Sequence, residues 1–144
     1  MKIAVIGGGG REHAVIKKLK ENKRVTKVYA LPGNGGIAQD AVCVAIKATD
    51  VEGVVEFAKR EQIDLVVVTP DDPLALGMVD RLQQAGIRAF GPTAKAAEIE
   101  SSKVFSKNLM KKYGIPTARY EVFSDPAAAV AYIEAENRFP VVVK

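Results

Sequence analysis

The sequence contains little that could stabilise a small protein through covalent or metal links. Among its 144 residues there is one cysteine, one histidine and no tryptophan. A single cysteine excludes an internal disulfide, and one histidine without partners gives no ligand set for zinc. A chain of this length buries roughly two-thirds of the surface that its unfolded form exposes. We therefore expect an ordinary hydrophobic core.

Long apolar runs and a strongly basic stripe are also absent. The first apolar run extends for about four residues, far short of the roughly 20 that a membrane helix needs. We expect no secretory leader, no membrane contact and a cytoplasmic location. The net charge of +4 is spread over interspersed basic and acidic residues. That pattern argues against a nucleic-acid partner.

Apolar runs of strand length alternate with segments of helical period, which is typical of a parallel sheet covered by helices on both faces. The fold class is therefore α/β, with an open, mostly parallel, twisted sheet. Helices are predicted over Arg11 to Lys20, after Thr49 or Asp50, and from Pro73 to a C-cap near Gly86. The predicted strands are Lys2 to Ile6, Val25 to Leu31, Ala41 to Ile46, Asp64 to Thr69 and Ile87 to Phe90.

The clean alternation of strand and helix ends after residues 91 and 92, and we place a domain boundary near residue 101. Residues 1–101 then form the first domain and residues 102–144 begin a second. Thr93 is expected to cap a short helix, and Asp125 with Pro126 to open another. Phe139 to Lys144 reads as a strand whose apolar side chains would need further chain or a partner to cover them. We therefore expect a fragment of a longer protein.

The strongest local signal is the run of four glycines, residues 7–10, between the first strand and the first helix. Residues without Cβ atoms let a ligand approach the main chain, and the free amides of the helix start suit a phosphate or carboxylate. Arg11 adds a fork of donors for an anion. A tight turn without a ligand is the alternative.

The glycine loop matches neither of the two common nucleotide-binding motifs, and this narrows the kind of anion that it could bind. A dinucleotide fingerprint needs a glycine where Glu12 or His13 stands, and an acidic residue at the end of the second strand, where Leu31 and Pro32 stand. A phosphate-binding loop of the Walker type would require a following Gly-Lys-Ser/Thr. A small phosphorylated molecule fits better.

Two further loops should leave strand ends at the same edge of the sheet, because ligands of open parallel sheets bind beyond the carboxyl ends of the strands. Asn34 follows the second strand and Asp71 follows the fourth, and either side chain could bond sugar hydroxyls or serve as a turn residue. Asp72 is predicted to be a helix N-cap. His13 either faces the ligand or is structural.

Several motifs together resemble the phosphoribosylamine-glycine ligase family of purine biosynthesis. They are IAVIGGGGREHA at residues 3–14, PGN at 32–34, FGPT at 90–93, SK at 102–103 and GIPT at 114–117. The resemblance covers nearly the whole chain in order. The GGREHA element is fairly specific to the family, whereas FGPT and GIPT are shared with other ATP-grasp ligases.

The resemblance implies a Rossmann-like substrate-binding domain in residues 1–101, followed by a linker helix and the truncated beginning of an ATP-grasp domain in residues 102–144. It implies an ATP- and Mg²⁺-dependent ligase that joins glycine to 5-phosphoribosylamine through glycyl phosphate. The implied substrate-binding residues are Gly9, Gly10, Arg11, Glu12, Asn34 and Asp71.

The same resemblance places Lys103 and Lys144 near ATP, with the magnesium ligands expected beyond residue 144. Thr69 and Asp71 depart from the family pattern, which has Gly and Glu, and the shorter Asp71 weakens the implied sugar contact. We expect the fragment alone to be inactive. The sequence indicates neither the catalytic residues nor the oligomeric state. Two alternatives remain: a dinucleotide-binding domain of an oxidoreductase, and a non-catalytic ligand-binding or assembly module.

Overall fold

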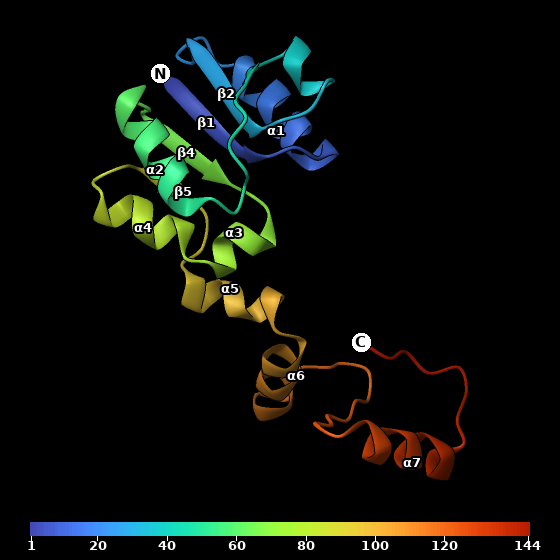
Figure 1. The fold of residues 1–144 in the computed structure, drawn as a ribbon. Coiled ribbons are helices and arrows are strands. Elements are labelled where there is room, and N and C mark those ends of the chain that lie inside the picture. Colours follow the sequence, from blue (N-terminus) through green and yellow to red (C-terminus); the bar gives the residue numbers. More distant parts are fainter. The chain divides into compact units, whose positions relative to one another are not determined.

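The computed structural model describes residues 1 to 144, which divide into two compact units. Unit 1 comprises Met1–Ser102 and unit 2 comprises Lys103–Lys144. The complete β-sheet lies in unit 1 (Figure 1). No helix in either unit combines the length and the apolar character needed to cross a membrane.

The sheet has five parallel strands in the order β3-β2-β1-β4-β5. At its centre, Ile3 of β1 pairs with Val28 of β2 on one side and with Leu65 of β4 on the other. This arrangement confirms the predicted open parallel α/β sheet. The strand bounds are β1 Lys2–Gly7, β2 Lys27–Pro32, β3 Val42–Cys43, β4 Leu65–Val68 and β5 Ala89–Phe90.

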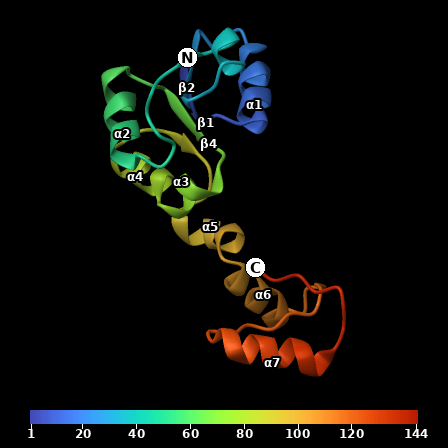
Figure 2. The same ribbon diagram turned by 45° about the vertical axis from the view of Figure 1, so that its right-hand side comes forward.

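Helices cover both faces of this sheet, with α1 on one side and α2 on the other (Figure 2). Unit 1 contains α1 Gly10–Lys20, the short 3-10 helix η1 Ile37–Gln39, α2 Val51–Arg60, α3 Asp71–Ala75, α4 Met78–Gln84 and α5 Ala94–Ser101. The Asp50 and Thr93 side chains cap α2 and α5 by accepting from the amides of Gly53 and Ala96, as predicted.

Side chains of the central strands alternate between two apolar clusters. Ala4 and Ile6 pack with residues of α2, α3 and α4, whereas Ile3 and Val5 pack with Ile16 of α1 on the opposite face. The period of two along β1 produces this division, because successive side chains in a strand point to opposite faces. The sheet is thereby held from both sides, and its carboxyl edge presents the loops described below.

The strand bounds differ from the prediction mainly at β3, at β5 and at the start of β2. Strand β3 is limited to Val42–Cys43, because it lies at the edge and pairs only with Tyr29 and Ala30 before the chain turns toward the α2 cluster. Strand β5 is similarly reduced to Ala89–Phe90. Strand β2 begins at Lys27 rather than Val25, because the Val25 amide bonds the Asn22 carbonyl within a turn.

The predicted single helix after Pro73 is instead two helices, and it begins earlier. Helix α3 starts at Asp71 with Pro70 in the N-cap position, so Asp72 lies inside the first turn and the prediction that it is the N-cap was wrong. Gly77, at φ 78°, separates α3 from α4. Gly86 follows the end of α4 at φ 74°, the left-handed conformation expected beside a C-cap.

Unit 2 consists of α6 Lys103–Lys112 and α7 Pro126–Glu136, joined and followed by irregular chain. Asp125 caps α7 by accepting from two amides, and Pro126 is its first residue, as predicted. The predicted strand over residues 139–144 is not formed. A strand requires a neighbour for its ladder of hydrogen bonds, and no segment of the 144 residues pairs with this one.

Candidate functional site

The glycine loop joins β1 to α1 at the carboxyl edge of the sheet. Gly9 is the N-cap of α1, and its amide donates to Glu12 Oε2 at 2.7 Å. This is half of a capping box, because glycine has no side chain that could accept from the first-turn amides in return. The amides of residues 10–12 therefore face the helix entrance without a side-chain acceptor, at the positive end of the helix dipole.

The glycines of this loop serve different purposes. A Cβ on Gly8 would lie 2.6 Å from the Gly33 carbonyl oxygen, so only glycine lets the two loops approach this closely. Gly7 adopts φ +120° and lies against Glu12. A Cβ on Gly10 would meet nothing within 4 Å. Packing explains the other loop glycines, whereas at Gly10 the fold leaves open space at the helix entrance.

Glu12 is predicted to bind substrate, but its carboxylate is buried and bonded within the protein. The side chain of Thr69 donates to Glu12 Oε1 at 2.7 Å, and Arg11 Nε donates to the same oxygen at 3.1 Å. Burial raises the pKa of Glu12, but the hydrogen bonds from Thr69, the Gly9 amide and Arg11 outweigh it and leave the pKa below its ordinary value. The carboxylate is therefore an anion that fixes the loop.

Arg11 stands at the helix entrance with its side chain 58% exposed. Its Nε is used by Glu12, which orients the guanidinium without occupying its two terminal nitrogens. Those nitrogens retain donors for a second anion, and a guanidinium fork matches phosphate or carboxylate oxygens. Arg11 thus has unused donors at the surface, whereas the Glu12 carboxylate is buried.

Asn34 ties its own loop to the glycine loop. Its Nδ2 donates to the Gly8 carbonyl oxygen at 2.6 Å, and its Oδ1 accepts from the Ile37 amide at 2.8 Å. Ile37 is fully buried in the α1-side cluster. Asn34 thus holds the two loops together, and its exposed side chain keeps one amide hydrogen that these two bonds do not use.

Asp71 begins α3 directly beyond β4, and Pro70 before it lies beside the glycine loop, 3.0 Å from where a Cβ of Gly7 would stand. The Asp71 Oδ1 atom is buried and has no hydrogen-bond partner among the described residues. Buried carboxylate oxygens are normally bonded, so this acceptor needs a donor from a water molecule or a ligand hydroxyl.

A three-residue cluster, His13, Lys20 and Asp40, closes the far side of the Asn34 loop. Asp40 Oδ2 lies 2.8 Å from His13 Nε2, and Asp40 Oδ1 lies 2.8 Å from Lys20 Nζ. Hydrogen bonds from Lys20 and His13 lower the pKa of Asp40 to about 2. His13 is thereby used to fasten the loop to α1.

Sequence reasoning missed Thr69 and Asp40 as members of the site. Thr69 directly follows the apolar run of β4, at the strand end where site residues gather, and that position was an available signal. Asp40 carries no such signal, since its partner His13 lies 27 positions away in the chain. Lys103 and Lys144 are exposed residues of unit 2, whereas the six other predicted site residues belong to unit 1.

Comparison with known families assigns both parts of the chain. Residues 1–100 match the model for the phosphoribosylglycinamide synthetase N domain, and residues 101–144 match that for the phosphoribosylglycinamide synthetase ATP-grasp (A) domain. Curated relatives named phosphoribosylamine-glycine ligase include those of Xanthomonas campestris pv. campestris, 51% identical over 146 residues, and Listeria monocytogenes serotype 4b, 50% identical over 145 residues. Each match covers 100% of this chain and 34% of the relative.

Solved structures agree with this assignment. The crystal structure of phosphoribosylamine-glycine ligase from Thermotoga maritima matches with a TM-score of 0.68 and 29% identity, over 94% of this chain and 30% of that one. The biotin carboxylase domain of Hydrogenobacter thermophilus 2-oxoglutarate carboxylase, in complex with magnesium ADP and bicarbonate, matches with a TM-score of 0.72 and 20% identity, over 96% of this chain and 33% of that one. The second likeness concerns the fold alone.

These findings favour the ligase interpretation of the sequence motifs over the oxidoreductase and assembly-module alternatives. The N-domain model alone covers residues 1–100, which is well over half of the 144-residue chain. The chain spans about a third of the length of the curated relatives that it matches, 34% in the two cited above. These matches, together with the motifs around the glycine loop, show that the chain belongs to the phosphoribosylglycinamide synthetase family.

Proposed function

We propose that unit 1 binds the phosphoribosyl group of 5-phosphoribosylamine, as part of a ligase that joins glycine to this amine with ATP. The phosphate would lie at the entrance of α1, against the amides of residues 10–12 and the terminal nitrogens of Arg11. The observation that carries the proposal is the incomplete capping of α1: Glu12 bonds the Gly9 amide, while Gly9 has no side chain that could accept from the first-turn amides. A phosphate supplies the missing acceptors and the negative charge.

The sugar would lie between the glycine loop and the start of α3. There the Asp71 carboxylate has a buried oxygen without a donor, and a ribose hydroxyl supplies one. Asn34 would hold the loops together and offer its remaining amide hydrogen to the ligand. Glu12 would act through Gly9 and Arg11 rather than by touching the substrate, because its carboxylate is already bonded to Thr69 and to them.

We assign Lys103 and Lys144, residues of the part that matches the ATP-grasp model, to the phosphates of ATP. Exposed ammonium groups suit such phosphates, because phosphoryl transfer depends mainly on positioning and charge stabilisation. For magnesium the donor set does not fit, since no group of three or more acidic, histidine or cysteine side chains gathers in the described residues. We therefore place no step of the reaction on a metal in this chain, and expect no turnover from residues 1–144 alone.

Titration with ribose 5-phosphate tests the substrate proposal. Binding is measured by calorimetry and by the NMR signals of the backbone amides of residues 8–12. Arg11→Ala should weaken binding about tenfold or more, because a hydrogen bond to a charged group contributes roughly 1.5–3 kcal/mol. Arg60→Ala is the matched control: Arg60 also pairs with the glutamate that follows it, with an Nε–Oε1 distance of 3.4 Å, but at the end of α2. Equal losses in both variants would contradict the proposal.

A second substitution separates binding from folding. Gly10→Ala places a methyl group in the open space at the helix entrance, because Cβ atoms point toward the helix N-terminus. It should weaken ribose 5-phosphate binding while leaving the melting temperature unchanged or higher, since alanine favours a helix over glycine. NAD(H) serves as the comparison ligand, and tighter binding of NAD(H) than of ribose 5-phosphate would reverse the assignment.

A further inference from the structure

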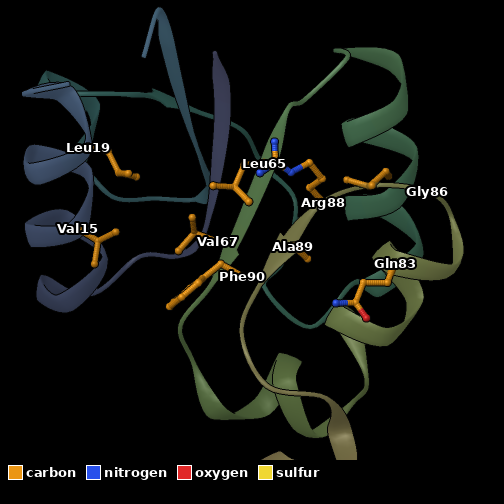
Figure 3. Close-up of a pocket in the computed structure, with 10 residues that line it drawn as sticks. Val15, Leu19, Leu65, Val67, Gln83, Gly86, Arg88, Ala89 and Phe90 are labelled. Carbon is orange, nitrogen blue, oxygen red and sulfur yellow. The ribbon is translucent and has the colours of Figure 1, made fainter. Parts of the chain in front are cut away.

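The face of the sheet that α1 covers is only half covered. Beside α1, an open groove of about 850 Å³ extends over β4 and β5. Figure 3 shows Val15 and Leu19 of α1 along one wall, Leu65 and Val67 of β4 on the floor, and Phe90 of β5 toward one end. Phe90 is 66% exposed. This groove is separate from the glycine loop and takes no part in the proposed substrate site.

The opposite face of the same strands is fully covered. There Val66 and Val68 of β4 pack in the cluster that includes Met78, Val79 and Leu82 of α4. A parallel sheet normally has helices on both faces, because its strands are apolar on both. Val67 of β4 is 6% exposed and Leu65 is partly buried, so the open apolar surface is centred on Phe90 of β5. This part of the face lacks the helix that the architecture would place on it.

The strand on the floor of the groove is as long as a short helix. A four-residue strand such as β4 is roughly 13 Å long at 3.3 Å per residue, and a helix of about nine residues has the same length. Val15 and Leu19 are four positions apart, so they form one stripe along α1. Arg88, the residue directly before β5, lines the groove and forms no ion pair in the structure.

We propose that this groove is the docking site for an amphipathic helix contributed by the polypeptide that follows these 144 residues in the full-length protein, with a carboxylate opposite Arg88. The chain spans 34% of its curated relatives, so most of their length is available to supply such a helix. Helix α7 is the alternative occupant within residues 103–144, and the test below distinguishes it from the downstream polypeptide. A second copy of the chain would oppose one concave groove with another. The inference rests on the fold and the family, and not on the substrate proposal.

The test measures thiol labelling in the 144-residue chain and in a chain extended with the downstream two-thirds of the Listeria monocytogenes relative. Cys43, the single native thiol, is first replaced by serine. Gln83→Cys then places a thiol in the groove, and Gln84→Cys places one on the same helix outside it. Labelling at position 83 should slow about tenfold or more in the extended chain, since a docked helix protects in proportion to its occupancy. Labelling at position 84 should stay the same.

Phe90→Glu provides a second readout in the same extended chain. It introduces a charge into the groove and should restore fast labelling at position 83, while the short chain with this substitution keeps its melting temperature, because Phe90 is exposed there. Equal labelling at position 83 in the short and extended chains would overturn the proposal. So would protection already present in the short chain, whether constant, which would indicate residues 103–144, or rising with protein concentration, which would indicate a second copy.

Discussion

Units 1 and 2 both contain regular helices, but their helices bury different amounts of apolar surface. In unit 1 two clusters of buried side chains pack against the faces of the sheet. In unit 2 the only buried residue is Ser106, and α7 has no buried residue although it carries Val130 and Tyr132. Helices of about ten residues are marginal in water unless an apolar face is packed. Unit 1 therefore has the means to fold by itself, whereas unit 2 lacks them.

Amide hydrogen exchange should give the largest contrast between the units. Amides of β1 and β4 open only with the core of unit 1, while amides of α7 open locally at little cost. We expect exchange in α7 to be faster by about three orders of magnitude or more, given typical unfolding free energies of 5–15 kcal/mol for a packed domain. Equal protection in both units would show that the helices of unit 2 are packed as stably as the core of unit 1.

Matched valine truncations sharpen the comparison at single residues. Val66 is 0% exposed in β4, and Val130 is 55% exposed in α7. Val66→Ala should lower the free energy of unfolding by about 2–3 kcal/mol, from lost burial plus the cavity left behind. Val130→Ala should change it by less than about 0.5 kcal/mol. Urea denaturation followed by circular dichroism measures both, and a loss at Val130 as large as that at Val66 would contradict the contrast.

Buried and exposed carboxylates provide the next comparison. Glu12 is 4% exposed with three donors on its carboxylate, whereas Glu136 of unit 2 makes ion pairs at 3.7 Å with Arg119 and Arg138 near the surface. Glu12→Gln replaces one acceptor by a donor that faces other donors, and should cost about 1–3 kcal/mol. Glu136→Gln should cost at most about 1 kcal/mol. Urea denaturation measures the loss of unfolding free energy in both variants. Equal losses would contradict the structural role given to Glu12.

The features that the sequence predicts well depend on residues close together along the chain. The alternation of apolar runs predicted the parallel sheet, and the caps at Asp50, Thr93 and Asp125 were recognisable because a capping side chain and its helix are adjacent. Strand lengths at the edges were overestimated, because pairing at β3 and β5 depends on where the chain turns away from its neighbour. The predicted strand at residues 139–144 needed a partner that the sequence itself does not specify.

The candidate site shows the same limit. The glycine loop was visible in the sequence, but the roles of its members depend on residues far along the chain. Glu12 is predicted to bind substrate, and the bond from Thr69, 57 positions later, gives its carboxylate a structural role that the local pattern does not show. Asp71 follows strand β4, as predicted. The lack of a hydrogen-bond partner for its buried Oδ1 depends on three-dimensional packing and is not visible in the sequence. Local pattern therefore indicates the candidate site, and long-range contacts distinguish candidate residues that support the loop from those whose polar groups are not bonded within the protein.

The smallest expected effect concerns the Asp40 cluster at the rim of unit 1. Lys20 and His13 hold the pKa of Asp40 at about 2, below its ordinary value of 3.8. A carboxyl with a lowered folded pKa stabilises the fold above its ordinary value, and that contribution is lost as the pH falls through the folded value. Wild type should therefore be slightly more stable than Asp40→Asn at pH 5, and the difference should shrink as the pH falls toward 2 and vanish below it. A difference that persists unchanged at pH 2, in denaturation curves recorded across this range, would mean that the loop is held by packing of Ile37 and not by the charge on Asp40.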